Sequence, residues 1–171
     1  TLWHTLSLHD ALPIYDDENI YVYAQGFGDY SRLKISAKQR DGKVWYDDCC
    51  EMFFDVNRDE VTHYQIITSA AGVLFDIINK RMRRGRRGWN QSTPWNGNFT
   101  VQVAKQGKES WSLEYSFPWK TFKKKKVPKP GTIWGFNIAW VKQLGKAQYA
   151  QWAPTYGNSL ATEHFGFILF E

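Results

Sequence analysis

The stretch SWSLEYSFP, residues 110–118, decides the fold class. Its large apolar side chains, Trp111, Leu113, Tyr115 and Phe117, alternate strictly with small or charged residues. Successive side chains of a β-strand point to opposite faces, so this pattern predicts a strand with one buried face. The closing proline ends the strand, because it has no N–H to donate to a sheet ladder.

Similar segments recur on both sides of this strand at a spacing of about a dozen residues, which is typical of a sandwich or barrel. The turn QGK joins residues 99–105 to it as a hairpin. No segment of ten or more residues shows helical periodicity, and a long polar loop is expected over 79–98. The sequence therefore predicts an all-β protein, an antiparallel β-sandwich of jelly-roll character. Further strands are expected near 20–25, 49–55, 63–68, 73–78, 133–141, 149–153 and 165–170.

A chain of 171 residues suits one domain with a substantial core. The opening TLWHTLSLHDALPI differs in pattern from the rest, so we expect residues 1–14 to be a foreign or disordered leader and 15–171 to form the domain. No apolar run approaches the roughly 20 residues that cross a bilayer. We therefore expect no membrane span.

The net charge of +5 comes mainly from two basic clusters, Arg81–Arg87 and Lys123–Lys126, each expected in a loop. Such clusters can bind a polyanion, although blocks of like charge are more often solvated loop tips. Polyanion binding stays open as an alternative function, and nucleic acid is not expected as a partner. Association through these clusters would weaken steeply with added salt.

The stretch VWYDDCCEMFFD, residues 44–55, raises a question about chemistry. Alternation places Cys50, Met52 and Phe54 on one face and Cys49, Glu51 and Phe53 on the other. A buried carboxylate without a partner costs several kcal/mol. Glu51 should therefore line a groove or make a pair, and an arginine across the sheet and a bound ligand are both open as its partner.

Several motifs follow one another along the chain. They are W-x-x-D-x-x-E-x-F-F-D at 45–55, HYQIITSAAGVLFD at 63–76, SWSLEYSFPWKTF at 110–122, PKPGTIWGFNIAW at 128–140 and EHFGFILF at 163–170. With these motifs in this order, the chain from about residue 15 to residue 170 resembles the family 9 carbohydrate-binding modules. That family normally has an opening strand before the segment YDDENIYV, and we expect this chain to lack it.

The resemblance implies a non-catalytic module that binds an oligo- or polysaccharide and is attached to other domains of an extracellular or cell-surface bacterial protein. It implies that Trp45 stacks on a sugar ring and that Glu51 accepts hydrogen bonds from hydroxyls. Gln65 matches a polar position of the family and is expected to contact the sugar, with a cross-strand amide as the alternative. The second tryptophan of the best-known members is absent, and Tyr156 or Asn158 is expected in its place.

Some positions depart from the family pattern. Ile67 stands where those members carry a sugar-binding arginine. A structural or interaction module without sugar affinity therefore remains an alternative. No cofactor is expected, with structural calcium as the one exception. The calcium-like spacing of Asp55, Asn57 and Asp59 lacks the glycine and glutamate that complete such a loop, and a polar turn explains it better.

Overall fold

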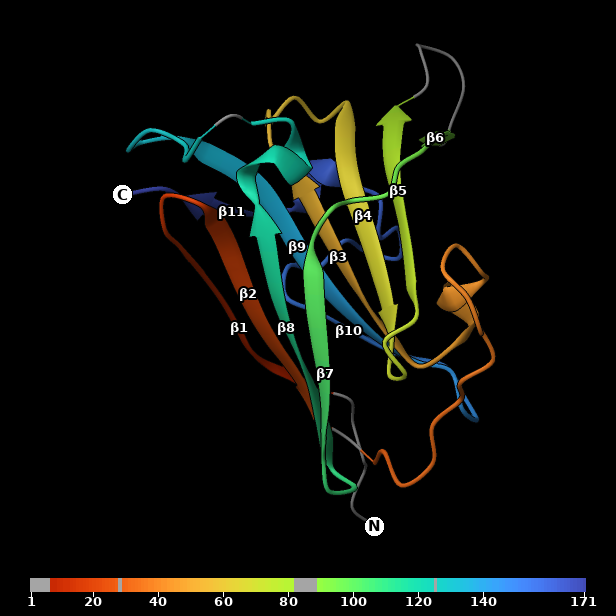
Figure 1. Ribbon diagram of the computed structural model, residues 1–171. Helices are drawn as coiled ribbons and strands as arrows, with labels where there is room; N and C mark the ends of the chain where they lie inside the picture. Colours follow the sequence, from red (N-terminus) through yellow and green to blue (C-terminus); the bar gives the residue numbers. More distant parts are fainter. Residues whose placement is uncertain (1–6, 28, 82–88, 125) are drawn as a thin grey trace.

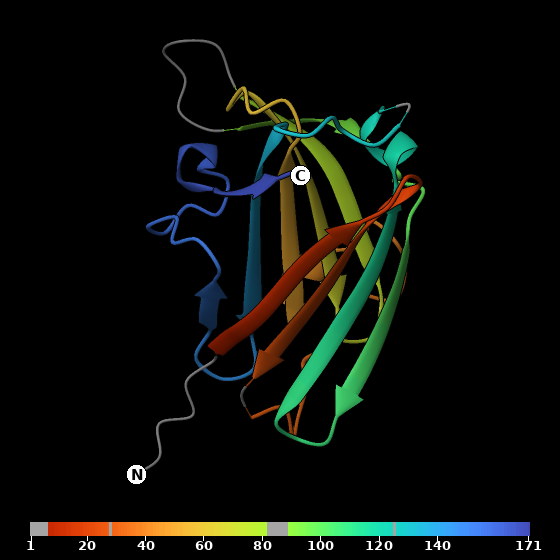
Figure 2. The same ribbon diagram turned by 90° about the vertical axis from the view of Figure 1, so that its left-hand side faces the viewer.

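The computed structural model describes residues 7–27, 29–81, 89–124 and 126–171. Two antiparallel sheets lie face to face, and the described part contains no α-helix (Figures 1 and 2). This confirms the predicted all-β sandwich. The first sheet has the order β1-β2-β8-β7, and the second has the order β10-β9-β3-β4-β5-β6 with β11 also paired to β9.

The strands of the four-stranded sheet are β1 (Ser7–Tyr15), β2 (Asn19–Phe27), β7 (Thr100–Gln106) and β8 (Ser110–Pro118). Those of the seven-stranded sheet are β3 (Cys49–Asp55), β4 (Thr62–Ser69), β5 (Leu74–Arg81), β6 (Trp89–Pro94), β9 (Ile133–Lys142), β10 (Gln148–Gln151) and β11 (Gly166–Leu169). Three short 3-10 turns complete the described elements: η1 (Val44–Tyr46), η2 (Trp119–Phe122) and η3 (Thr162–His164).

Two strands lie where none was predicted. Strand β6 falls inside the expected loop 79–98, where polar residues show no alternation, and its pairing with β5 contains a register shift. Strand β1 takes up residues 7–14 of the expected leader and pairs with β2, so a strand does precede YDDENIYV. The expectation that residues 1–14 are foreign to the protein stays a prediction.

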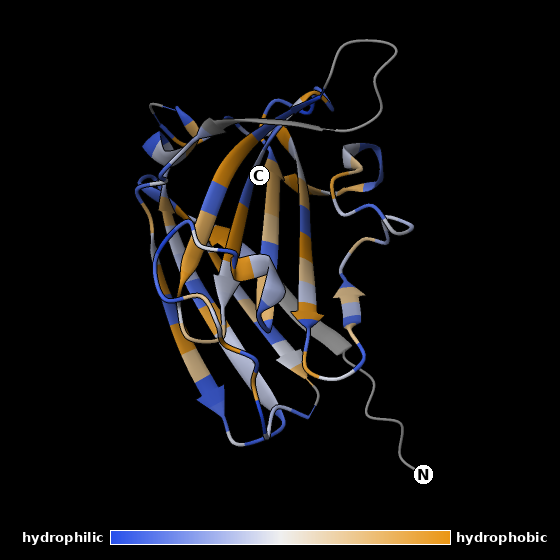
Figure 3. Cartoon of the chain, turned by 90° about the vertical axis from the view of Figure 1, so that its right-hand side faces the viewer, coloured by the Kyte–Doolittle hydropathy of each residue, from blue (hydrophilic) through white to orange (hydrophobic). Residues whose placement is uncertain are grey.

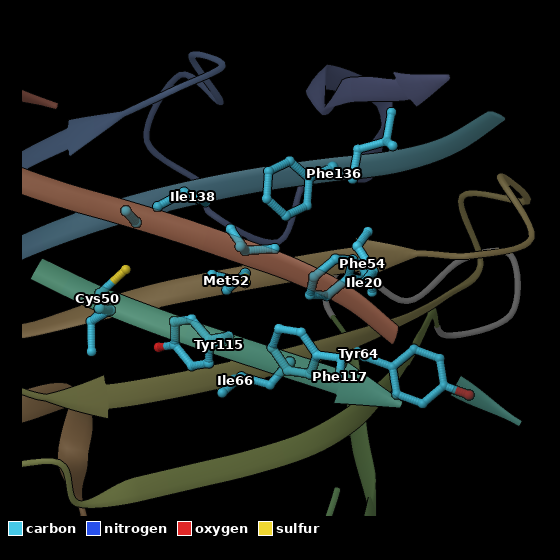
Figure 4. Packing of buried hydrophobic residues seen from close by; sticks show 14 of the residues in the cluster. Ile20, Cys50, Met52, Phe54, Tyr64, Ile66, Tyr115, Phe117, Phe136 and Ile138 are labelled. Carbon is cyan, nitrogen blue, oxygen red and sulfur yellow. The ribbon is translucent and has the colours of Figure 1, made fainter. Parts of the chain in front are cut away.

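The hydrophobic core fills the space between the two sheets. Large side chains of β8 meet the inward face of β3, and the rings of Phe117 and Phe54 lie 5.3 Å apart between centroids (Figure 4). At one end of the core Trp111 meets Trp140 edge-on at 4.4 Å. The buried hydroxyl of Tyr115 donates a 2.7 Å hydrogen bond to Thr68 across the interface. This packing fixes the seven-stranded sheet, whose other face is left for the loops.

The outward face of the seven-stranded sheet is bordered by two long segments. These segments are residues 29–48 and residues 152–165, and both pack on the outward face through apolar side chains. Figure 3 shows the molecule turned to its right-hand side, with apolar and polar residues following one another along the strands. The first segment carries η1 and the second carries η3. The expected site residues lie on this face or on these two segments.

Candidate functional site

Strand register brings the central site residues to one face of the sheet. Glu51 of β3 stands opposite Ile67 of β4 and Ala139 of β9. Ile67 in turn stands opposite Phe75 of β5. Directly opposed residues of antiparallel strands project to the same side. Glu51 therefore projects outward with its neighbours, and the inward face of β3 belongs to the core.

A chain of hydrogen bonds crosses the outward face from Glu51. The Gln65 side-chain amide donates to Glu51 Oε2 at 3.1 Å, and Gln65 Oε1 accepts from Asn79 Nδ2 at 2.8 Å. Asn79 Nδ2 also lies 3.1 Å from His63 Nε2. In the described part of the chain, the partner of Glu51 is thus the Gln65 amide of the neighbouring strand, where an arginine or a ligand was expected. The sequence contains no signal for Asn79 as the residue that orients Gln65.

Burial changes the titration of two groups on this face. It raises the pKa of Glu51 to about 7, and the hydrogen bond from Gln65 only partly opposes this rise. Burial lowers the pKa of His63 to about 4. A carboxyl group with this pKa exchanges its proton near neutral pH, so both its acceptor strength and its charge change there.

Trp45 lies on η1 and is half-buried against the apolar part of the same face. Its ring meets Phe75 edge-on, with centroids 5.0 Å apart and an interplanar angle of 76°. It packs on the cluster formed by Val44, Cys49, Ile67 and Val141. Phe75, Ile67 and Glu51 form one row across the outward face, so Trp45 packs on the same row that carries Glu51, two strands away.

Two buried aspartates hold η1 in place. Asp47 accepts hydrogen bonds from the backbone N–H groups of Ser36 at 2.8 Å and Ala37 at 2.9 Å. Asp48 accepts from the N–H groups of Lys34 at 3.0 Å and Gln143 at 2.5 Å. The carboxylates thus fasten the segment before Trp45 to the turn after β9. No local sequence pattern indicates this positioning role of Asp48.

The second segment that borders the site, residues 152–165, follows β10 at the edge of the seven-stranded sheet. We call this segment the second border. Strands β10 and β11 pair with the two halves of β9 and leave a gap at Asn137. The buried Asn137 side chain fills this gap, donating to Ala153 O and accepting from Ala153 N, both at 2.9 Å. Farther along, Leu160 and Phe165 pack on the outward-facing Phe53 and Ala139.

Tyr156 and Asn158 lie on this second border, away from the centre of the site. Tyr156 is 84% exposed, and its ring meets His164 edge-on at 5.1 Å. Asn158 Oδ1 accepts the N–H of Leu160 at 3.1 Å and shapes the turn. Among the described residues, no hydrogen bond or ring contact joins either side chain to Trp45 or Glu51.

A cavity of about 560 Å³ opens between β10 and the start of this border. Its volume lies within the range of about 300–1,000 Å³ usual for ligand pockets. The expected site residues do not line it, although its wall includes the glycine between Tyr156 and Asn158. The lining residues are Tyr149, Gln151, Pro154, Gly157 and Ser159.

The calcium-like residues serve a turn. Asp55 accepts the backbone N–H groups of Asp59 at 3.3 Å and Glu60 at 2.9 Å. Asn57 accepts a 3.3 Å hydrogen bond from the Lys124 ammonium group, a cation that opposes metal binding there. These residues do not fit a calcium ion, and the described part of the chain contains no cluster of three or more acidic, histidine or cysteine side chains suited to a metal.

The basic clusters are only partly described. Arg81 ends β5 and lies 3.8 Å from Glu163, whereas residues 82–88 of the first cluster and Lys125 of the second lie outside the described residues. In the described part of the chain, no helix is long and apolar enough to cross a membrane.

Comparisons with known proteins agree with this architecture. A candidate carbohydrate-binding protein from Bacteroides uniformis superimposes with a TM-score of 0.70 at 20% identity, covering 93% of this chain and 76% of the other. A family 9 module from Caldicellulosiruptor kristjanssonii in complex with glucose gives 0.64 at 17% identity, covering 98% and 81%. A structure of a family 9 module from the same organism with cellotriose gives 0.62 at 18% identity, covering 93% and 72%.

At these identities the structural likeness shows the fold alone. A search of curated proteins found no match. The sequence model described as "Carbohydrate family 9 binding domain-like" matches residues 11–171, which is most of the chain. The chain therefore belongs to the carbohydrate family 9 binding domain-like family.

Proposed function

We propose that this domain binds a saccharide on the outward face of the seven-stranded sheet and does not cleave it. Trp45 stacks on one sugar ring, and the Glu51 carboxylate accepts hydrogen bonds from its hydroxyl groups. The observation that carries the proposal is that Trp45 packs on Phe75, which stands in one strand-register row with Ile67 and Glu51, and that Gln65 orients the Glu51 carboxylate.

The chemistry of the face suits a neutral, hydroxylated ligand. The apolar face of a pyranose ring packs on an indole, and an aromatic platform of this size gives a large contact area. Hydrogen bonds to an ionised carboxylate are shorter and roughly twice as strong as those between neutral groups. The Gln65 amide is hydrogen-bonded at both its nitrogen and its oxygen, to Glu51 and Asn79. The polar groups of the site are therefore held in place without a ligand.

The remaining features of the proposal follow from the family. The module would be part of an extracellular or cell-surface bacterial protein, attached to other domains. Tyr156 and Asn158 would contact the ligand from the second border, because both lie on the exposed turn that faces solvent there. Their contribution should be smaller than that of Trp45 and Glu51.

Calorimetric titration with glucose and cellotriose, supported by a glycan array, tests the proposal. Trp45→Ala should reduce saccharide affinity about tenfold or more, and Trp45→Phe should retain part of it, because a smaller ring still stacks. Glu51→Gln should weaken binding at pH 8, where the wild-type carboxylate is ionised. Tyr23→Ala, on β2 of the other sheet, is the matched control and should bind as the wild type does.

Two outcomes would contradict the proposal. If no saccharide on the array binds, the domain is a structural or interaction module. If the chain instead binds heparin, and added salt weakens that binding steeply, the basic clusters carry the function.

A further inference from the structure

The cavity beside β10 has no role in the site built around Trp45 and Glu51. We infer that it is a second saccharide subsite, with Tyr149 as its aromatic wall and the Gln151 amide as its hydrogen-bond donor. The natural ligand is then an oligosaccharide of at least two pyranose rings. This inference rests on the proposed function and adds the length of the ligand to it.

Strand register connects the cavity to the first subsite. Gln151 stands opposite Ala139, and Ala139 stands opposite Glu51, so the three residues form one row on the outward face. Neighbouring strands are about 4.8 Å apart, which separates Glu51 and Gln151 by about 10 Å. A single pyranose ring does not span that distance, whereas a linear disaccharide or trisaccharide does.

The surface between the two subsites is apolar. Ala139 itself is buried beneath Leu160 and Phe165 of the second border, so the partly buried Leu160 side chain supplies the apolar surface there. Such a surface offers contact to the C–H groups of a sugar chain and does not compete for its hydroxyl groups. A ligand can therefore continue from Glu51 toward the cavity without burying an unmatched polar group.

Hydrogen bonding fixes the orientation of the Gln151 amide. Gln151 Oε1 accepts from the backbone N–H of Thr155 at 3.0 Å and from the Thr155 hydroxyl at 2.9 Å. Both bonds occupy the oxygen, so Nε2 is the part of the amide left to donate into the cavity that Gln151 lines. A donor here complements the acceptor at Glu51 and would bind a hydroxyl oxygen of the second ring.

Tyr149 supplies the aromatic surface of the cavity. It stands opposite Val141 on the outward face and is 66% exposed. Val141 belongs to the apolar cluster on which Trp45 packs. Tyr149 and Trp45 therefore both lie beside this cluster. An exposed tyrosine in a cavity wall is suited to stacking on a second sugar ring.

The test compares glucose with cellotriose by calorimetric titration. Wild type should bind cellotriose more tightly than glucose. Tyr149→Ala should lower cellotriose affinity about three- to tenfold and leave glucose affinity within about twofold, and Tyr149→Phe should retain both. Gln151→Glu keeps the acceptor for Thr155 and removes the donor, and it should lower only cellotriose affinity by about three- to tenfold.

Tyr23→Ala is the control, and circular dichroism checks that each variant is folded. Equal affinity of the wild type for the two sugars, or an unchanged cellotriose affinity in Tyr149→Ala, overturns the second subsite while Trp45→Ala still reports on the proposed function. If neither sugar binds to the wild type, both the proposed function for these glucose-based probes and the second subsite fail.

Discussion

The two faces of the seven-stranded sheet are built from alternate residues of the same strands, yet they are held by different forces. On the inward face of β3, Cys50, Met52 and Phe54 are buried among apolar side chains. On the outward face, Glu51 belongs to a hydrogen-bonded chain and Phe53 is covered by a loop residue, Phe165. The inward face thus depends on the other sheet, and the outward face depends on loops that polar side chains fasten.

The adjacent cysteines show the contrast at one step of the chain. Cys50 lies in the main core, and Cys49 lies in the smaller cluster beneath Trp45. Both are free thiols and both are buried. Burial raises the pKa of each thiol well above its usual range. Burial alone therefore does not distinguish the two faces, and the difference must be sought in what covers them.

The largest effect is expected on the inward face. Phe54→Ala should lower the free energy of unfolding by about 3–5 kcal/mol, because it leaves a cavity among several rings that pack on Phe54. Urea denaturation measures this change. Phe167→Ala, at a ring that is 57% exposed, is the control and should cost less than about 1 kcal/mol. Equal losses at the two positions would remove the contrast.

A somewhat smaller loss of stability is expected when the hydrogen bonds that hold η1 on the outward face are removed. Asp48→Ala should cost roughly 2–4 kcal/mol, because the N–H groups of Lys34 and Gln143 lose their acceptor. Hydrogen exchange should then quicken in residues 34–37, and saccharide affinity should fall as η1 loosens. Asp17→Ala, at an exposed turn residue, serves as the control. Unchanged exchange in 34–37 would contradict the fastening role.

The titration of Glu51 should give a pH-dependent effect on the order of 1–3 kcal/mol. The folded pKa of about 7 exceeds the ordinary value of 4.5, so the native state binds more protons than the unfolded state between these pH values. The stabilisation is complete below pH 4.5 and is lost as pH rises through 7. Glu51→Gln should abolish this component.

Comparison with Glu51→Gln separates this component from that of His63. The lowered pKa of His63 acts in the opposite direction, since its stabilisation is lost as pH falls from 6.5 toward 4. Both proteins share this second component, so it cancels in the difference between their unfolding free energies. A difference that does not change between pH 4.5 and pH 8 would show that Glu51 titrates normally.

The smallest effect is expected where the outward face meets solvent. Glu163 lies 3.8 Å from Arg81, and both side chains are largely in contact with water. Exposed ion pairs of this kind contribute roughly 0–1 kcal/mol. Glu163→Gln should therefore change the thermal midpoint by little, even at low salt. A loss comparable to that of Asp48→Ala would mean that the second border is held by charge.

The predictable part of the fold lies in strands with a regular pattern. Strand β8 and the β3-β4-β5 meander were recognised because their side chains alternate or their turns carry turn residues. Strand β6 has neither signal, since its sequence WNQSTP is polar and it forms by pairing at the sheet edge. A cross-strand amide was considered as the alternative role of Gln65, whereas its pairing with Glu51 follows only from the register of β3 and β4.

The borders of the site could not be predicted. The contacts of Asp48 with Gln143 and of Asn137 with Ala153 join residues far apart in the sequence or across a gap between strands. No local pattern marks such contacts. The cavity beside β10 was missed for the same reason, because a strand and a loop that follows it enclose space only once both are placed.

The sequence by itself determined the sandwich, the two faces of β3 and the family, because alternation and motif order are local properties that every strand carries in its own residues. Only the tertiary structure decided that Trp45 packs on the row of residues that carries Glu51 and that a cavity lies at the same row. The physical reason is that these relations depend on strand register and on hydrogen bonds from side chains to distant segments of the chain. Both are fixed only when the chain is folded.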